Sequence, residues 1–138
     1  MTPGPLDVET DPRFPSGKWV GYWLQVGVHG GKLTQELLLT FRAGTLEGTG
    51  RDFVGRFLVR GSYSTEDGRC RWTKKYVGKH DVFYQGFNEG KGIWGTWEIP
   101  SSKLKGGFHI WPEEMGDPTE HSLKAAIDEP VGEVVGIA

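Results

Sequence analysis

The stretch that decides the fold is residues 44–97, which read GTLEGTGRDFVGRFLVRGSYSTEDGRCRWTKKYVGKHDVFYQGFNEGKGIWGTW. Within it, runs in which every second residue is aromatic, aliphatic or glycine are separated by turn sequences such as TEDG and NEGKG. Successive side chains of a β-strand point to opposite faces of a sheet, so each run predicts a strand with one buried face. The positions predicted to point inward are Leu46, Gly48, Gly50, Asp52, Phe53, Gly55, Phe57, Val59, Gly61, Tyr63, Cys70, Trp72, Lys74, Tyr76, His80, Val82, Tyr84, Gly86, Ile93, Gly95 and Trp97.

The same alternation continues on both sides of this stretch. Residues 33–43 fit either a short helix or a strand, and we favour a strand because it places Leu37, Leu39 and Phe41 on one face. Gly30 and Gly31 precede this strand and predict a hairpin turn. The predicted strands are residues 18–27, 33–43, 45–51, 53–64, 69–77, 80–87, 93–99 and 106–111.

The inward positions change from even to odd numbers between Asp52 and Phe53. A slip of one residue would turn every following side chain to the other face of the sheet. The change therefore predicts a turn or a bulge at this point.

Eight short strands joined by short turns, with no crossover helix, predict an all-β antiparallel meander. Such a meander most simply closes into an eight-stranded up-and-down β-barrel, which leaves no unpaired strand edge. A two-sheet β-sandwich built from the same strands is the alternative.

The chain of 138 residues has the length of one domain. Residues 1–15 contain four prolines and predict a flexible N-terminal arm. Residues 16–112 hold the predicted barrel, and residues 113–138 form a C-terminal extension in which Thr119 or Ser122 is a candidate cap for a helical turn.

Composition and charge narrow the classes of partner. The formal net charge of −2 argues against general binding to nucleic acids or membrane surfaces, although it leaves room for a local basic patch. The single cysteine, Cys70, excludes a disulfide within the chain. We see no signal peptide and no apolar stretch of transmembrane length, so we expect a soluble, cytoplasmic protein.

The sequence resembles the avidin and lipocalin class of barrels, also described as calycin-like. The resemblance is carried by an opening SGKW strand, by the eight-strand meander over residues 16–111 and by late tryptophans at Trp72, Trp94, Trp97 and Trp111. It implies a barrel with a ligand site inside, which in avidins holds biotin through polar residues of the first strands and through tryptophans. The VGVHGGK segment, residues 26–32, lacks the asparagine and serine groups expected there, so the biotin-binding residues are not matched.

Asp52, Lys74 and His80 are the polar exceptions among the inward positions, and their candidate neighbours are Tyr76, Tyr84, Tyr63 and Gln25. A buried lysine is costly unless it is paired, and Asp52 is the candidate partner. The cluster predicts polar groups that orient a ligand in a cavity. The alternative interpretation is a structural ion pair at one end of the barrel, and a third is acid–base catalysis by His80 or Asp52.

Inward tryptophans allow two interpretations as well. Trp19, Trp23, Trp72 and Trp97 share the inward parity and could line an aromatic pocket. Core filling is the favoured interpretation, since the interior of an eight-stranded barrel is only wide enough for side chains.

On the opposite face, neighbouring strands carry a predicted basic patch made of Arg56, Arg60, Arg69, Arg71 and Lys75. The patch suits an acidic partner, phosphate or single-stranded nucleic acid, or it is a solvated strand face. Nucleic acid is the less expected partner because the chain is net negative. Outward Phe83, Phe87 and Trp94 make a homodimer the expected assembly.

Metal and cofactor signals are absent from the sequence. The four histidines have no metal-ligand spacing, and no phosphate loop or nucleophile elbow occurs. We therefore expect no metal, no cofactor and no catalytic residues.

These patterns together predict a non-catalytic barrel that binds a small molecule of unknown identity. The predicted ligand-binding residues are Asp52, Lys74, His80, Tyr76, Tyr84, Trp19, Trp23, Trp72 and Trp97. A structural or protein-interaction module with a filled barrel is the alternative function. An isomerase- or cyclase-like enzyme that uses the inner polar cluster is a third.

Overall fold

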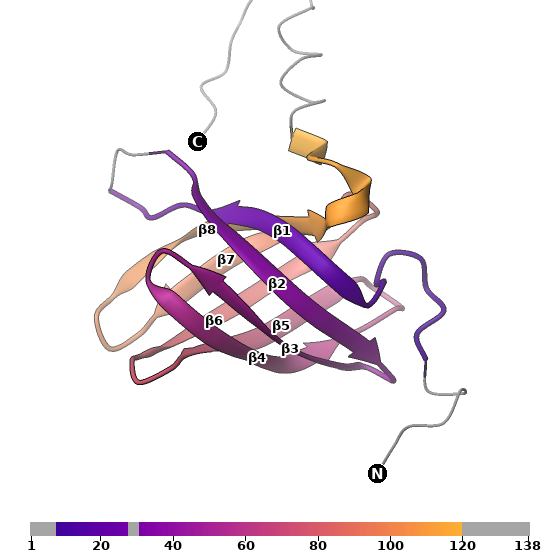
Figure 1. Ribbon diagram of the computed structural model, residues 1–138, viewed down its shortest axis with the longest axis horizontal. Helices are drawn as coiled ribbons and strands as arrows, with labels where there is room; N and C mark the ends of the chain where they lie inside the picture. Colours follow the sequence, from indigo (N-terminus) through magenta and orange to yellow (C-terminus); the bar gives the residue numbers. More distant parts are fainter. Residues whose placement is uncertain (1–7, 28–30, 120–138) are drawn as a thin grey trace, which may run out of the picture.

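Eight antiparallel strands follow one another around a closed barrel, each hydrogen-bonded to its neighbours in sequence, and β1 also pairs with β8 (Figure 1). This computed structural model describes residues 8–27 and 31–119. The strands are β1 (Gly17–Trp23), β2 (Leu33–Arg42), β3 (Thr45–Asp52), β4 (Gly55–Tyr63), β5 (Arg69–Tyr76), β6 (Asp81–Asn88), β7 (Ile93–Ile99) and β8 (Leu104–Pro112). The predicted all-β up-and-down barrel is thus confirmed, and the sandwich is wrong.

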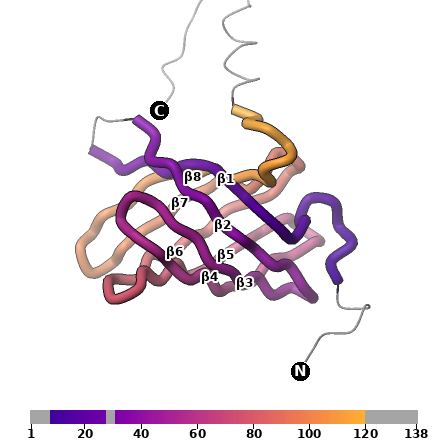
Figure 2. The backbone as a smooth tube through the Cα atoms, viewed as in Figure 1, coloured from indigo at the N-terminus to yellow at the C-terminus, as the bar shows by residue number. Residues whose placement is uncertain are grey.

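Alternation along the strands was predicted correctly in most places. β2 is a strand rather than a helix, and Leu37, Leu39 and Phe41 are buried on its inner face. Of the first predicted hairpin turn, Gly30 lies outside the described residues. The tube in Figure 2 shows the connections β1–β2, β3–β4, β5–β6 and β7–β8 at one end of the barrel, on the left in this view. We call this end the mouth.

Two predicted inward positions lie in turns instead. Asp52 pairs directly with Gly55, so Phe53 and Val54 form the tip of the β3–β4 hairpin, and the Phe53 side chain is exposed. His80 precedes β6 and is exposed as well. The prediction that Phe53 and His80 point into the barrel is therefore wrong, because alternation holds only for residues inside a strand.

Glycines on the inner face let neighbouring strands approach closely. A Cβ atom on Gly61 would lie 2.0 Å from the Arg71 carbonyl oxygen, and one on Gly95 would lie 2.1 Å from the Gln85 carbonyl oxygen. No side chain fits at such distances. These two positions therefore require glycine for the tight coiling of β4 to β7.

The barrel end opposite the mouth is filled by aromatic rings. Phe14, from the segment that precedes β1, is completely buried and packs on Phe41 and Tyr63 with ring centroids 5.4 and 4.8 Å away. The neighbouring Arg13 donates hydrogen bonds to the carbonyl oxygens of Asn88 and Thr65. In its described part, the predicted N-terminal arm therefore lies against the barrel.

The C-terminal segment leaves the same end of the barrel. A short 3-10 helix, η2 (Glu113–Met115), follows β8. The backbone N–H of Thr119 donates a hydrogen bond of 2.7 Å to the Asp117 carboxylate. Asp117 therefore takes the capping role that was predicted for Thr119. The other predicted cap, Ser122, lies outside the described residues.

Candidate functional site

The candidate site is a pocket of about 190 Å³ at the mouth of the barrel. Its inner wall comes from the ends of β1, β5, β6 and β7, and its rim comes from the connections between strands. The residues that line it are Trp23, Gln25, Phe53, Val54, Tyr76, His80, Val82, Tyr84, Trp97, Ile99 and Leu104. The wall is therefore mostly aromatic and aliphatic.

Two tryptophans form one side of the pocket. Trp23 and Trp97 meet edge to face, with ring centroids 5.5 Å apart and an angle of 84° between the rings. Trp97 Nε1 donates a hydrogen bond of 2.9 Å to the Leu24 carbonyl oxygen, which ties this wall to the end of β1. Phe53 stacks on the outer face of the pair, 6.0 Å from Trp23.

Inside the barrel, Lys74 is the centre of a polar network. Its Nζ donates to Asp52 Oδ2 at 2.6 Å, to Gln35 Oε1 at 3.2 Å and to the Tyr84 hydroxyl at 3.3 Å. The Tyr76 hydroxyl donates to the same Asp52 oxygen at 2.6 Å. The side chains of Lys74 and Asp52 expose 1% and 0% of their surfaces, so this is a fully buried ion pair.

Aromatic rings enclose the Lys74 ammonium group. Its nitrogen lies 4.3 Å from the centre of the Phe57 ring and 4.9 Å from that of Tyr76, within the range of cation–π attraction. Burial lowers the pKa of Lys74 to about 8, against the opposing effect of the Asp52 charge. Burial, with the nearby Asp52 charge, raises the pKa of Tyr76 and of Tyr84, so both hydroxyls stay protonated as donors or acceptors.

Two buried donors near the pocket have no hydrogen-bond partner among the described residues. They are Trp23 Nε1 and Gln35 Nε2. Buried polar groups are nearly always satisfied, so the buried, unpaired indole N–H of Trp23, a residue that lines the pocket, is a donor still available to an acceptor atom.

The structure places seven of the nine predicted site residues in the network or around the pocket, His80 only on its rim. Asp52, Lys74, Tyr76 and Tyr84 form the network, and Trp23 and Trp97 form the pocket wall. Tyr76 and Tyr84 belong to both groups, whereas neither Asp52 nor Lys74 lines the pocket. The ion pair is therefore connected to the pocket through Tyr76 and Tyr84, whose hydroxyl groups it binds.

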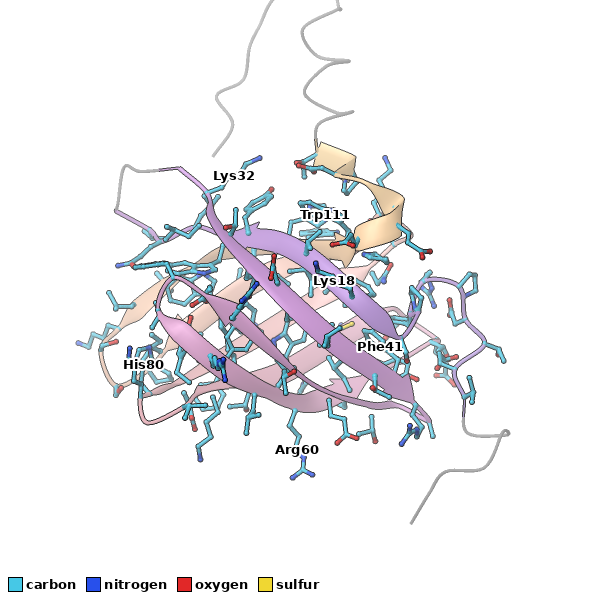
Figure 3. All side chains as sticks on the ribbon, viewed as in Figure 1. Lys18, Lys32, Phe41, Arg60, His80 and Trp111 are labelled. Atoms are coloured by element: carbon cyan, nitrogen blue, oxygen red, sulfur yellow. The ribbon has the colours of Figure 1, made fainter. Side chains whose placement is uncertain are left out.

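Trp72 and Trp19 lie away from the pocket, and His80 lies on its rim but outside the polar network. His80 stands on the rim, as Figure 3 shows at the left-hand end. Its ring packs against the Tyr76 ring, with centroids 5.3 Å apart, and does not join the ion pair. Trp72 stacks on the inner side of Tyr84 at 5.2 Å, deeper in the core and away from the pocket. Trp19 is fully buried against Phe41 and donates to the Pro15 carbonyl oxygen.

Gln35 is a site residue that the sequence interpretation missed. It shares the inward parity of Leu37, Leu39 and Phe41, so the signal was present in β2. A neutral amide among apolar inward positions is the residue that accepts the second Lys74 hydrogen bond.

The predicted basic patch faces outward, with Arg56, Arg60, Arg69, Arg71 and Lys75 exposed on β4 and β5. Figure 3 shows Arg60 pointing away from the barrel. Phe83, Phe87 and Trp94 are exposed on the adjoining β6 and β7. The homodimer and the acidic partner stay predictions for this face.

Residues 8–27 and 31–119 contain no group of histidine, cysteine or acidic side chains able to hold a metal ion. They also contain no helix long and apolar enough to cross a membrane.

Comparisons with models of protein families, with curated proteins and with solved structures found no match to this chain. The closed eight-stranded antiparallel barrel is the general calycin-like architecture that the resemblance implied. A closer relationship to avidins or lipocalins gains no support from these comparisons.

Proposed function

We propose that the barrel binds a small, largely apolar molecule in the mouth pocket and performs no catalysis on it. The observation that carries this proposal is the aromatic pocket whose wall contains Trp23 with an unpaired indole N–H. An acceptor atom on the ligand, such as a carbonyl oxygen, would complete that hydrogen bond once a small shift of the Trp23 ring exposes the buried N–H.

Pocket size limits the ligand. Sites for drug-sized molecules usually measure about 300–1,000 Å³, whereas an apolar cavity of about 150 Å³ holds benzene. A pocket of about 190 Å³ suits one substituted aromatic ring, or the end of a longer molecule that extends out of the mouth. Trp23, Trp97, Tyr76 and Tyr84 offer ring faces and edges for stacking on it.

The Lys74–Asp52 pair has a positioning role in this proposal. It lies below the pocket and holds the hydroxyls of Tyr76 and Tyr84, whose rings form the wall. A ligand would thus meet the rings and not the charges, which fits an uncharged molecule. This revises the expectation that Asp52, Lys74 and His80 themselves orient a polar or anionic group.

A titration with two probes of similar size tests the proposal. Acetophenone carries a carbonyl acceptor beside its ring, and ethylbenzene lacks it. We expect acetophenone to bind more tightly and to shift the Trp23 indole N–H signal in a nitrogen–proton correlation spectrum. Trp23→Phe keeps a ring but removes the donor, so it should abolish the preference for acetophenone while ethylbenzene still binds.

The control variant is Trp94→Phe, since Trp94 stands on the outer face of β7. It should leave both affinities unchanged. If neither probe shifts the Trp23 or Trp97 signal at millimolar concentration, the pocket is not a binding site for such molecules.

A further inference from the structure

The four connections at the mouth differ in charge from the opposite end of the barrel. Their described residues are 24–27, 31–32, 53–54, 77–80 and 100–103, and none of these is an aspartate or glutamate. They include Lys32, Lys79 and Lys103. At the opposite end, the turns and η2 carry Glu66, Asp67, Glu89, Glu113 and Glu114. The barrel therefore has a basic mouth and an acidic far end.

Exposed apolar side chains stand on the tips of the same connections. Phe53 exposes 75% of its surface, Val77 66% and Val26 65%, and each belongs to a different connection. Leu104, at the start of β8, is exposed on the same rim. Single exposed apolar residues are ordinary, but a ring of them around one opening marks an interaction site.

The lysines of the mouth have no acidic partner among the described residues. Lys79 Nζ donates to the Val54 carbonyl oxygen at 2.8 Å, beside the Phe53 tip. Lys32 Nζ lies 4.4 Å from the centre of the Tyr22 ring. Neither contact involves a carboxylate; the nearby Asp52 is paired with Lys74 inside the barrel, and Asp81, at the start of β6, forms no ion pair with these lysines.

We infer that the mouth docks onto the surface of an anionic lipid bilayer. Phe53, Val77 and Val26 enter the boundary between head groups and acyl chains, and the three lysines face the anionic head groups. Apolar side chains on separate tips suit a fluid surface, which needs no matching shape. The absence of acidic side chains among the described residues of the connections selects an anionic surface.

The net charge of −2 suggested that no membrane partner should be expected, but the distribution of charge matters more. Tilted strands of this length span about 20 Å, whereas charges are screened over about 10 Å at ordinary ionic strength. A bilayer at the mouth thus experiences the lysines and little of the acidic far end. This inference does not require that the pocket bind a ligand.

Sedimentation of the full chain with vesicles tests the inference. One set of vesicles contains phosphatidylcholine alone and the other contains phosphatidylcholine with 30% phosphatidylserine by design. We expect binding to the anionic vesicles at 50 mM salt, at least about tenfold weaker binding at 500 mM salt, and little binding to phosphatidylcholine alone.

Two pairs of substitutions locate the surface. Val26→Glu with Val77→Glu should reduce vesicle binding at least tenfold, and neither residue lines the pocket. The matched control is Leu38→Glu with Leu58→Glu, because both leucines are similarly exposed but stand on the wall of β2 and β4. It should bind vesicles as the unmodified chain does.

Three results would overturn the inference: no binding to anionic vesicles, equal binding to both sets, or equal losses in the two double variants. Trp23→Phe separates the two proposals, because it should change probe binding in the pocket and leave vesicle binding unchanged. Circular dichroism of each variant checks that the barrel is folded before the vesicle measurements are compared.

Discussion

At the scale of single residues, Lys74 shows how a charge is held inside a small barrel. Its ammonium group has three hydrogen-bond acceptors and lies over the faces of aromatic rings. Removing an ion from water costs several kcal/mol, and the attraction of a partner offsets this only with good geometry and further hydrogen bonds. The network of Asp52, Gln35, Tyr76 and Tyr84 supplies both conditions.

Lys74→Met should lower the free energy of unfolding by about 3–5 kcal/mol, because it leaves the Asp52 carboxylate buried without its cationic partner. The double variant Asp52→Asn with Lys74→Met should recover much of this loss, since neither charge is then buried. Urea denaturation followed by tryptophan fluorescence measures both values. Equal stability of the single variant and the unmodified chain would show that Asp52 needs no cation.

At the scale of elements, alternation along the strands explains most of the barrel. Within β4, β5 and β6 the buried and exposed positions alternate as the sequence indicates. Alternation stops where a strand ends, which is why Phe53 and His80 lie on the rim. Inward glycines mark where two strands approach so closely that no side chain fits.

Gly95→Ala should destabilise the barrel by about 1–3 kcal/mol, because its Cβ would lie 2.1 Å from the Gln85 carbonyl oxygen and the strands would have to separate. Gly107→Ala is the control on the neighbouring strand. A Cβ there would meet its nearest atom at 3.5 Å, an ordinary contact. Thermal unfolding compares the two, and an equal shift in both midpoints would contradict the steric argument.

At the scale of the whole molecule, the two ends of the barrel differ in the packing of their interiors and in their charge. The mouth has a pocket, an apolar rim and lysines, whereas the far end is closed by Phe14 and surrounded by acidic turns. Glu9 accepts a hydrogen bond from the Tyr63 hydroxyl there, and burial raises the pKa of Tyr63 to about 12. The segment before β1 is thus part of the core at that end.

Phe14→Ala should lower the free energy of unfolding by about 3–5 kcal/mol, the usual cost of truncating a buried phenylalanine. Val8→Ala, in the same segment but largely exposed, should change it by no more than about 0.5 kcal/mol. Chemical denaturation measures both. A small effect of Phe14→Ala would mean that the far end repacks without the ring.

The sequence predicted the interiors of the strands well and the strand ends less well. The alternation of residues along each strand determined the fold class and the number of strands. It also determined the inward positions of Asp52, Lys74, Tyr76 and Tyr84, because the two-residue period of a strand is a local property. Their meeting in one network depends on register: Lys74 of β5 reaches Asp52 of β3 and Gln35 of β2 across the interior.

Within the strands, sequence alone therefore determined most of the side chains that enter the barrel, since burial of an apolar face dictates the alternation. Only the tertiary structure decided how much space they leave: Trp19, Trp72 and Phe14 fill the core, and the pocket lies where the wall meets the turns. It also decided that the basic and apolar connections share one end. Closure and packing bring together residues distant in the chain, and no local period encodes that.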